Sequence, residues 1–566
     1  MSKIKLKSAD AQQVLEDFAG LGGSNALCGS AAIEMRNFRL LSDGTLEKRC
    51  GWQPTAAFYG EVRGVWQGTL GSAALTVIAA ECSVYRMEDG TPVKVGALND
   101  SVGRVSFVKY RERLYLLDGD CIYVLDNAAA SFRQAIGYAP LYGHNWHPTD
   151  GGEVNEPLNL LSTRLRVHYF NTTGSTVFHL PYYAAQIDCV RVDNSKITDF
   201  GFSPGSNKVT VHQSGAYVEI AFTMAYAPAL REKLLYCTRA LCELTEAREC
   251  LLLYGGKARN KLFSASTVDD NQLNYCKVSY LDADPLYFKA SNVLTVGAED
   301  APVTSLCRQH GRILAFCALG AASISFEKEG DGVECYPILR GVGCTAPLEL
   351  SLNGDPVIVN AGGIFKLSSP VSAPDEFQLT CLTDEVSGML FNGFLQNAVA
   401  FSDVRHGELW FRDPNDVSGL VWVYNVPRKC WYTFDGINAS FFLELNGCIG
   451  FAFYDSVCLF DEIYRCDGAE PFEAVWQSSF LAISSPEDVK RALRVTLVCE
   501  NTEAASLTLT TEKRSRTLTP DATRHNCPDV CELRPSLGRF RLLRITLRDA
   551  GESRSHYYRL AIYANL

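Results

Sequence analysis

The chain has 566 residues, of which 47% are hydrophobic and 21% charged, and this balance excludes a largely disordered protein. Its formal net charge of −11 disfavours a protein that wraps nucleic acid, since such proteins carry an excess of lysine and arginine. The 44 glycines, 25 tyrosines and 29 phenylalanines favour β-structure, because aromatic side chains suit a half-buried pleated surface.

Residues 1–30 are predicted to form a peripheral N-terminal arm, which is either loose or docks on a neighbour. Within it, Ala11–Phe18 predicts about two helical turns, because Val14 and Phe18 lie four positions apart on one helical face. The basic first residues lack the apolar core of a signal peptide, and no apolar run is long enough to predict a transmembrane helix.

Many of the 21 cysteines fall within apolar, strand-like runs. Examples are Cys82, Cys121, Cys317, Cys448 and Cys458. This placement is typical of reduced thiols in the core of a protein assembled in a cytosol.

Residues 33–52 read IEMRNFRLLSDGTLEKRCGW and predict a β-hairpin. The turn falls at residues 42–44, where Asp-Gly is a strong hairpin signal because glycine accepts a positive φ. Four basic residues, Arg36, Arg39, Lys48 and Arg49, predict an exposed hairpin whose charged edges block pairing with other strands.

From about residue 62 to about residue 466, a hairpin unit of two short apolar runs around a turn recurs. Units occur at Leu75–Gly90, Arg113–Asp126, Glu249–Ser266, Gly407–Phe434 and Cys448–Asp461, and the most regular stretch, Arg312–Ser369, contains two joined by residues 340–344. The starts at Arg312, Asp355, Gly407 and Cys448 are 43, 52 and 41 residues apart. Four-stranded propeller blades repeat at about 40–50 residues, so the sequence predicts an all-β, six- or seven-bladed β-propeller.

Two β-sandwiches are predicted in addition to the propeller. Residues 158–226 contain short alternating strands separated by Gly, Asn and Pro turns, and the amphipathic segment Ala229–Glu246 predicts a helix that returns the chain to the propeller. After about residue 470, alternating strands replace the blade pattern. The predicted division is an N-terminal arm (1–30), the first part of the propeller (31–150), an inserted β-sandwich (151–232), the remainder of the propeller (233–468) and a C-terminal β-sandwich (469–566).

The predicted C-terminal strands carry many arginines. They are Arg491, Arg494, Arg514, Arg516, Arg541, Arg544 and Arg548. Their placement favours a solvated face or a surface for a protein partner, with contacts to DNA phosphates as an alternative.

Two segments have spacings found at zinc sites. His144 and His147 are separated by two residues and followed by Asp150, although Pro148 and the adjacent glycines favour a linker into the inserted domain. The second candidate comprises His525, Cys527 and Cys531, with no evident fourth ligand.

Other conspicuous residues have a structural interpretation. Asp118 and Asp120 could form a carboxylate pair, but an acidic turn between strands needs no such role. The glycines at 341–343 and 362–363 precede no predicted helix, which favours turns over phosphate loops. Trp410, Trp422 and Trp431 could bind glycans, but strand positions favour the core. With no G-x-S-x-G or HExxH motif, we predict no enzyme, no catalytic residues, no cofactor and no metal.

Several stretches resemble the propeller proteins of phage tails and necks. MRNFRLLSDGTLEKRCGW (35–52) resembles their opening, with Asn-x-Arg before a Gly turn and Lys/Arg-Arg-x-Gly after it, although Cys50 stands where Pro is commoner. VYNVPRKCWYTFDG (423–436) resembles a blade running from Tyr-Asn to Trp, and residues 340–368 resemble their Gly-x-Gly stretch and the blade after it. AVWQSSF (474–480) and EDVKRALRVTLVCE (487–500) resemble the strands that open their terminal sandwich. The likeness spans most of residues 33–566 apart from the insert.

The resemblance implies a virion structural protein similar to the tail nozzle or packaged-DNA stabilisation proteins of short-tailed bacteriophages. Such proteins form a homo-oligomeric ring, typically a hexamer, below the portal and adaptor in the tail or neck. They dock tail fibre or spike proteins, and double-stranded DNA passes through their channel during ejection. The expected location is therefore the virion, after assembly in the host cytoplasm. The acidic net charge agrees with a channel in which DNA slides.

Two other classes of function stay open. The first is a carbohydrate-binding or receptor-binding propeller of a phage tail, and the second is a cellular scaffold propeller. Glycan hydrolysis would need two carboxylates roughly 5–10 Å apart on a central funnel, and the sequence shows no plain pair of this kind. Glycan binding that is lost in Trp410→Ala or Trp431→Ala would favour the first class.

Overall fold

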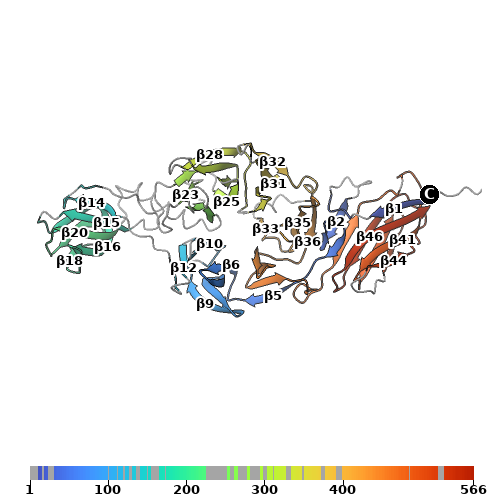
Figure 1. Cartoon of the computed structure of the whole chain (residues 1–566), viewed down its shortest axis with the longest axis horizontal. Coiled ribbons are helices and arrows are strands. Elements are labelled where there is room, and N and C mark those ends of the chain that lie inside the picture. Colours follow the sequence, from blue (N-terminus) through green and yellow to red (C-terminus); the bar gives the residue numbers. More distant parts are fainter. Residues whose placement is uncertain are drawn as a thin grey trace, which may run out of the picture. The chain divides into compact units, whose positions relative to one another are not determined.

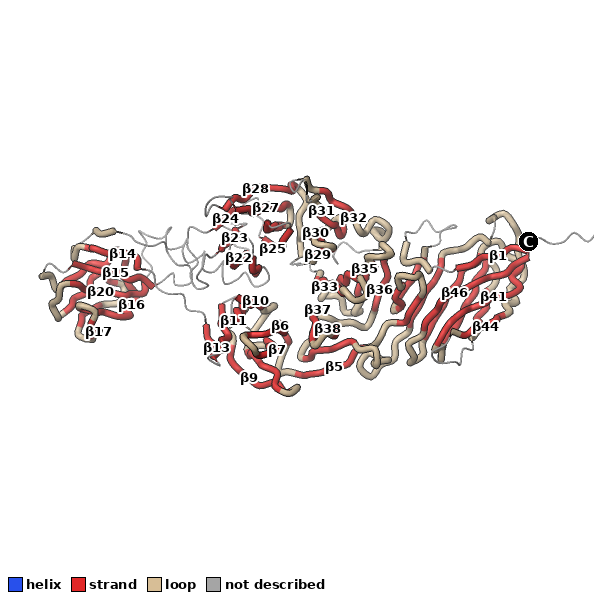
Figure 2. The backbone as a smooth tube through the Cα atoms, in the orientation of Figure 1, coloured by secondary structure: helices blue, strands red, loops and turns tan. Residues whose placement is uncertain are grey.

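The computed structural model describes residues 10–565 apart from segments 16–17, 23–30, 100, 111–112, 119–121, 127–130, 135–140, 150, 154–164, 172–173, 225–250, 255–260, 266–276, 281–292, 297–302, 310–311, 327–332, 347–349, 371, 373–375, 390–397, 484 and 521–527. Every element in the described part is a β-strand (Figure 2), so the predicted all-β class is confirmed. The predicted helix at Ala229–Glu246 lies outside the described residues. Within the residues described, no helix reaches the length and hydropathy needed to cross a membrane.

The chain divides into two compact units. Unit 1 comprises residues 1–62 and 345–566, and unit 2 comprises residues 63–344. Unit 2 is therefore continuous in sequence, whereas unit 1 is built from both ends of the chain.

The described residues of unit 2 form four sheets of four strands, in which neighbouring strands are consecutive along the chain. The sheets are β6 (Val62–Leu70), β7 (Ala73–Ala80), β8 (Ser83–Glu88) and β9 (Thr91–Ala97); β10 (Ser106–Tyr110), β11 (Arg113–Leu117), β12 (Ile122–Asp126) and β13 (Ser131–Gln134); β21 (Leu251–Tyr254), β22 (Lys261–Ala265), β23 (Lys277–Tyr280) and β24 (Val293–Thr295); and β25 (Val303–Gln309), β26 (Arg312–Cys317), β27 (Gly320–Phe326) and β28 (Val333–Arg340). This meander is the blade unit of a propeller, and the predicted hairpins at Leu75–Gly90 and Arg113–Asp126 fall within it as β7–β8 and β11–β12.

The inserted domain of unit 2 lies between the second and third of these sheets in sequence. Its strands are β14 (Leu141–Trp146), β15 (Leu165–Asn171), β16 (Val177–Val192), β17 (Ser195–Ile197), β18 (Phe200–Phe202), β19 (Ser206–Val211) and β20 (Tyr217–Met224). The first part of the long strand β16 pairs with β19 and the second part with β20, with a register shift between them. The strands form one seven-stranded sheet of order β14-β15-β20-β16-β19-β18, with β17 on β16, around a core that includes Phe170, Phe178, Val190 and Ile220.

Unit 1 contains three further blade sheets. They are β29 (Ser351–Leu352), β30 (Asp355–Asn360), β31 (Gly363–Ser368) and β32 (Gln378–Cys381); β33 (Val399–Asp403), β34 (Glu408–Arg412), β35 (Val421–Asn425) and β36 (Cys430–Phe434); and β37 (Phe441–Leu445), β38 (Cys448–Phe453) and β39 (Ser456–Phe460) with β5 (Trp52–Ala57). In the last sheet the outer strand comes from the opposite end of the chain, since β5 pairs with β39. The described blade sheets thus number seven, within the predicted range.

Unit 1 also contains the C-terminal β-sandwich, which includes the first strands of the chain (Figure 1). One sheet has the order β3-β4-β46-β41-β44 with β1 also on β46, and the other, β2-β40-β45-β42-β43, continues through β36 into the blade β33–β36. The strands are β1 (Asp10–Leu15), β2 (Ala32–Arg36), β3 (Phe38–Leu40), β4 (Leu46–Lys48), β40 (Ala474–Ser478), β41 (Arg491–Glu500), β42 (Ala505–Thr511), β43 (Ser515–Leu518), β44 (Asp529–Leu533), β45 (Leu543–Asp549) and β46 (His556–Asn565).

The predicted helical turns at Ala11–Phe18 are wrong, because β1 runs antiparallel to β46 with Asp10 opposite Asn565. β46 supplies backbone partners along the whole of β1, and such pairing outweighs a weak local preference for helix. Phe18 follows the strand and is buried, with its ring edge-to-face against Trp476 at 5.2 Å.

The predicted hairpin is present as β3–β4, with Phe38 opposite Lys48, but its predicted exposure is wrong. The side chains of Arg39, Lys48 and Arg49 are only 5%, 2% and 1% exposed. The reason is that β4 pairs with β46, while β2, which leads into the hairpin, pairs with β36 and β40. Residues 32–48, predicted as propeller, therefore lie in the sheets of the C-terminal sandwich.

The cysteines that the structure describes are free thiols, and five of them are buried. The buried thiols are Cys317, Cys344, Cys458, Cys499 and Cys531. Burial raises the pKa of Cys458 to about 12, so this thiol stays protonated and unreactive, as a core thiol should.

We expect His556, the first residue of β46, to make the free energy of unfolding depend on pH. Its Nε2 lies 2.7 Å from Thr45 Oγ1, which itself donates to Asp43 Oδ1 at 2.7 Å, so the threonine oxygen accepts the Nε2–H of a neutral ring. Burial lowers the pKa of His556 below 6.5, although Glu47 and Asp43 oppose this shift. The folded-state pKa is thus below the unfolded one, and the stabilisation is present above about pH 6.5 and lost as pH falls through the lowered pKa.

We therefore expect the unfolding midpoint to fall between about pH 7 and about pH 5, with a slope of at most about 1.4 kcal/mol per pH unit from this ring. The His556→Gln variant keeps a donor at the ε position and should show a shallower dependence. Urea unfolding at a series of pH values measures the difference. An unchanged pH profile in the variant would contradict this role of His556.

The glycines of the connector at residues 340–344 differ in what surrounds them. A Cβ on Gly343 would lie 1.8 Å from the carbonyl oxygen of Cys317, whereas Gly341, with φ +77°, has nothing within 4 Å of an added Cβ. We expect Gly343→Ala to lower the free energy of unfolding by about 3 kcal/mol or more through overpacking against backbone. Gly341→Ala should cost only about 1–2 kcal/mol from its left-handed conformation. Urea unfolding of both variants checks the order, and equal losses would refute it.

Candidate functional site

A nine-stranded sheet passes from the blade β33–β36 into the sandwich, and charged side chains are buried where the two meet. At this point β2 lies between β36 and β40, with Arg36 opposite both Thr433 and Val475. The residues around it form what we call the joint network: Arg36, Asn37, Arg39, Lys48, Arg49, Asp403, Glu408, Asp435, Asp467 and Asp549.

Arg49 has a hydrogen bond for each of its five N–H groups. Nε donates to Asn37 Oδ1 at 2.9 Å. Nη1 donates to Asp467 Oδ1 at 2.8 Å and to the Cys50 carbonyl at 3.0 Å. Nη2 donates to Asp467 Oδ2 at 2.5 Å and to the Asp435 carbonyl at 2.9 Å. A lysine could not reproduce this planar, bidentate arrangement, so the position specifies arginine.

Asn37 connects β2 to β3 in the left-handed backbone region, with φ 59°. Asparagine tolerates this conformation better than most residues because its short polar side chain bonds locally. Its Nδ2 donates to Asp435 Oδ1 at 2.5 Å and to the Glu473 carbonyl at 2.8 Å, while Oδ1 accepts from Arg49 Nε and from the Asp435 N–H at 3.0 Å. Both the backbone and the amide group therefore require asparagine here.

Arg39 holds the hairpin to the blade. Its Nε donates to Glu408 Oε1 at 2.9 Å, and its Nη2 lies 3.7 Å from Asp403 Oδ2. Glu408 also accepts from the Tyr432 hydroxyl at 2.6 Å and from Trp410 Nε1 at 2.8 Å. Burial lowers the pKa of Arg39, but the adjacent carboxylates outweigh this effect, so its pKa is raised overall and the guanidinium stays charged.

Asp403, His406 and Glu408 offer ligand atoms within 4.8 Å of one another, and we tested them as a metal site. Asp403 accepts from His406 Nδ1 at 2.5 Å and from the N–H groups of Arg405 and His406 at 3.1 and 3.2 Å. Both carboxylate oxygens of Glu408 already accept hydrogen bonds, Oε1 from Arg39 and Tyr432 and Oε2 from Trp410. The guanidinium of Arg39 supplies the positive charge between these carboxylates, so the arrangement fits an ion-pair network and not a metal site.

Lys48 is the third buried cation of the hairpin. Its ammonium donates to the Gly551 carbonyl and lies 3.7 Å from Asp549, which is fully buried and accepts from the Ser555 and Tyr557 hydroxyls. Burial lowers the pKa of Lys48, and Asp549 opposes this shift. The basic residues of the hairpin are therefore structural, and each reaches a carboxylate from a distant segment.

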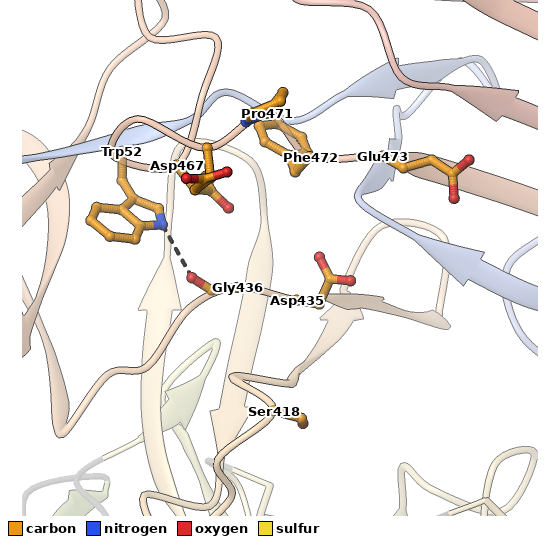
Figure 3. Close-up of a pocket in the computed structure, with 9 residues that line it drawn as sticks. Trp52, Ser418, Asp435, Gly436, Asp467, Pro471, Phe472 and Glu473 are labelled. Atoms are coloured by element: carbon orange, nitrogen blue, oxygen red, sulfur yellow. Dashed lines mark hydrogen bonds between the residues drawn. The ribbon is translucent and has the colours of Figure 1, made fainter.

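A pocket of about 520 Å³ opens beside the joint network (Figure 3). It is lined by Trp52, Ser418, Asp435, Gly436, Asp467, Glu470, Pro471, Phe472 and Glu473. The indole N–H of Trp52 donates to the Gly436 carbonyl at 3.3 Å, and Phe472 covers the guanidinium of Arg49 at 3.8 Å. Figure 3 shows Trp52 at one end of the pocket, Glu473 at the other and Asp435 between them. We take this pocket as the candidate functional site.

The pocket wall carries four carboxylates, of Asp435, Asp467, Glu470 and Glu473. Three of them contact arginines: Asp435 pairs with Arg36, Asp467 with Arg49, and Glu473 with Arg548 at 2.8 Å. Glu470 is exposed, and its backbone N–H donates to the Asp467 carbonyl. The wall is therefore nearly neutral and carries oxygen acceptors held in place by their guanidinium partners.

The sequence did not predict this pocket, because its residues come from positions that are far apart. The nearest sequence signal is the acidic run DGAEPFE at residues 467–473, which follows the last blade. Nothing in that run indicates that Trp52 and Ser418 lie against it. Of the three tryptophans proposed for glycan binding, Trp410 and Trp431 are 1% exposed and Trp422 is 7% exposed, so their predicted place in the core is confirmed.

The predicted metal candidates are not assembled in the part of the chain described. His144 lies within β14 and not in a linker, and its Nε2 is 3.1 Å from Glu153, while His147 Nδ1 is 2.7 Å from Thr149 Oγ1. Asp150, His525, Cys527 and Asp120 lie outside the described residues. Asp118 is buried, and its carbonyl accepts from Arg63.

Most of the C-terminal arginines are exposed, which a solvated face, a surface for a protein partner and contacts to DNA phosphates would all require. Arg491, Arg514, Arg516, Arg541 and Arg548 are exposed. Arg494 pairs with Glu532 at 3.1 Å, so part of the positive charge on this face is compensated within the chain.

No family model matches the chain, and no curated protein matches its sequence. Among solved structures, YCF48 bound to a D1 peptide is 9% identical and aligns over 76% of this chain and 96% of its own, with a TM-score of 0.32. The WD40 domain of SCAP from fission yeast is 8% identical over 80% of this chain and 98% of its own, with a TM-score of 0.30. An exo-β-1,3-galactanase from Phanerochaete chrysosporium is 10% identical over 81% and 95%, with a TM-score of 0.17. Because these TM-scores are low, the assignment of the propeller fold rests on the strand pairing of the chain itself.

Proposed function

We propose that this chain is a virion structural protein, a ring-forming component of the tail or neck of a short-tailed bacteriophage. In this role it lies below the portal, conducts and retains packaged DNA and docks other tail proteins. The observation that supports the proposal is that residues from three of the phage-like stretches meet in one place. Asn37 and Arg49 from the first stretch bond Asp435 from the second, and β2 pairs with the strand of Trp476 from the last.

The structure also explains why particular residue types occupy other positions in these stretches. A Cβ on Gly51 would lie 2.1 Å from the carbonyl oxygen of Cys466, so the backbones approach too closely for any side chain. Asn425 Nδ2 donates to the Leu40 carbonyl of β3 at 2.8 Å, and Trp431 Nε1 donates to the Leu382 carbonyl at 2.6 Å. The stretches that carry the likeness therefore include residues that join a blade to the sandwich.

The joint also suits a component that bears load. The nine-stranded sheet carries hydrogen bonds continuously from the blade into the sandwich. The buried ion pairs Arg39–Glu408 and Arg49–Asp467 hold the sandwich hairpin to the blade segments. A closed ring is built from heterologous interfaces with cyclic symmetry, and rigid subunits keep such a ring closed.

Electron microscopy of the purified full-length chain, together with light scattering, tests the proposal. We expect closed rings, typically of six copies, and a gene located beside those for a portal and a capsid protein. We also expect no stable complex with double-stranded DNA at physiological salt, given the net charge of −11. A chain that stays monomeric at every concentration and joins no particle would refute the proposal.

A further inference from the structure

We infer that the pocket beside the joint network binds a short, uncharged oligosaccharide. This inference does not depend on the proposed ring, so either can fail alone. The pocket has a volume of about 520 Å³, within the range of about 300–1,000 Å³ that small-molecule sites occupy. The lining combines the aromatic rings of Trp52 and Phe472 with carboxylate acceptors, which is the mixture of apolar and directional groups that such sites use.

The charge balance of the pocket selects against ions. An anion would find the arginines behind the wall already paired and would lie beside the exposed carboxylate of Glu470. A cation would find three of the four wall carboxylates already paired with Arg36, Arg49 and Arg548, so little attraction is left for it. A neutral ligand avoids both costs, because it leaves the existing ion pairs intact.

The carboxylates match the hydroxyl groups of a sugar. An ionised carboxylate only accepts hydrogen bonds and has capacity for more than one donor on each oxygen, and a sugar hydroxyl is a donor. Asp467 keeps lone pairs beyond those used by the bidentate Arg49, and Glu470 has an exposed carboxylate. Hydrogen bonds to charged acceptors are stronger than bonds between neutral groups, which favours a polyhydroxylated ligand over an apolar one.

The pocket is also pre-organised. Asp435 is held by Arg36 and Asn37, and the orientation of Trp52 is fixed by its bond to Gly436 and by edge-to-face packing on Phe451 at 5.2 Å. Groups that are already ordered lose little conformational freedom on binding, so a small ligand gains more of the interaction energy. The indole ring can pack against the C–H face of a sugar ring while the carboxylates accept from its hydroxyls.

A glycan array that carries neutral oligosaccharides alongside sulfated and sialylated ones tests the inference on the full-length protein. We expect binding to neutral members and none to anionic ones, with the affinity for the best neutral member then measured by calorimetry. Trp52→Phe should weaken this affinity by about tenfold, because phenylalanine can still pack on Phe451 but offers a smaller ring to the ligand. Ser418→Trp, which fills the pocket from an exposed position, should abolish binding.

Glu444→Ala serves as the matched control, because Glu444 is an exposed carboxylate on β37 that does not line the pocket. It should bind like the wild type, and circular dichroism should show that all variants are folded. The inference is overturned if the folded wild type binds no array member, if it prefers anionic glycans, or if Ser418→Trp binds as tightly as the wild type.

Discussion

Replacing Arg49 with methionine is expected to lower the free energy of unfolding of unit 1 by about 3–5 kcal/mol, the cost of removing one partner from a buried ion pair. The variant leaves the carboxylate of Asp467, 9% exposed, without its guanidinium, and Asn37 Oδ1 without its side-chain donor. Burial already raises the pKa of Asp467 above 3.8 even with Arg49 in place. A group with a raised folded-state pKa stabilises at low pH, so the variant should recover stability as pH falls.

Urea unfolding followed by tryptophan fluorescence measures this loss, and two further variants calibrate it. Arg548→Met removes an exposed arginine that pairs with Glu473 on the surface, and such pairs contribute about 0–1 kcal/mol. Arg49→Lys should fall between the two, because lysine keeps the charge and loses the bidentate geometry. If Arg49→Met were no less stable than Arg548→Met, the structural role of Arg49 would be disproved.

Deleting residues 556–565, which form β46, should prevent the sandwich and the joint from folding. β46 pairs with β41 along one edge and with β1 and β4 along the other. It also buries Tyr557, Leu560 and Ile562. Each large buried side chain is worth about 2–5 kcal/mol on truncation, and together they approach the whole stability of a domain, about 5–15 kcal/mol.

Limited proteolysis with mass spectrometry would locate the damage. We expect rapid cleavage within residues 10–57 and 474–549, while residues 63–344 of unit 2 remain as resistant as in the intact chain. Ile562→Ala is the graded control and should lower the stability of unit 1 by about 2–5 kcal/mol while keeping the fold. A truncated chain with the unfolding midpoint of the intact protein would show that β46 is dispensable.

The blades could be predicted from sequence because their pattern is local. Each is a meander in which a strand pairs with its neighbour across a short turn, as in Arg113–Asp126, so alternation and turn residues identify both partners at once. The turn at Gly343 could be predicted in the same way, because this glycine lies between two of the repeated hairpins. The predicted core position of the tryptophans in β34–β36 also depended only on strand pattern.

The joint could not be predicted, because its partners lie at opposite ends of the sequence. Arg49 and Asp467 are separated by 418 positions, and Arg39 and Glu408 by 369. A basic residue in a short hairpin gives the same local signal whether it faces water or a buried carboxylate. The pairing of β1 with β46 was missed for the same reason, and its residues were interpreted as helix. The pocket could not be predicted either, because Trp52 and residues 467–473, which line it, are far apart in the sequence.

During synthesis, β1, β2, β4 and β5 leave the ribosome long before their partners β46, β36, β40 and β39 are made. At about 5–20 residues per second, the roughly 500 residues between β1 and β46 take roughly 30–100 s to translate. Unit 2, which is continuous from residue 63 to residue 344, can fold in that interval. Unit 1 must wait, with the edges of its first strands unpaired, until β46 has emerged. The interval before β46 emerges is therefore when the unpaired first strands are most exposed to aggregation.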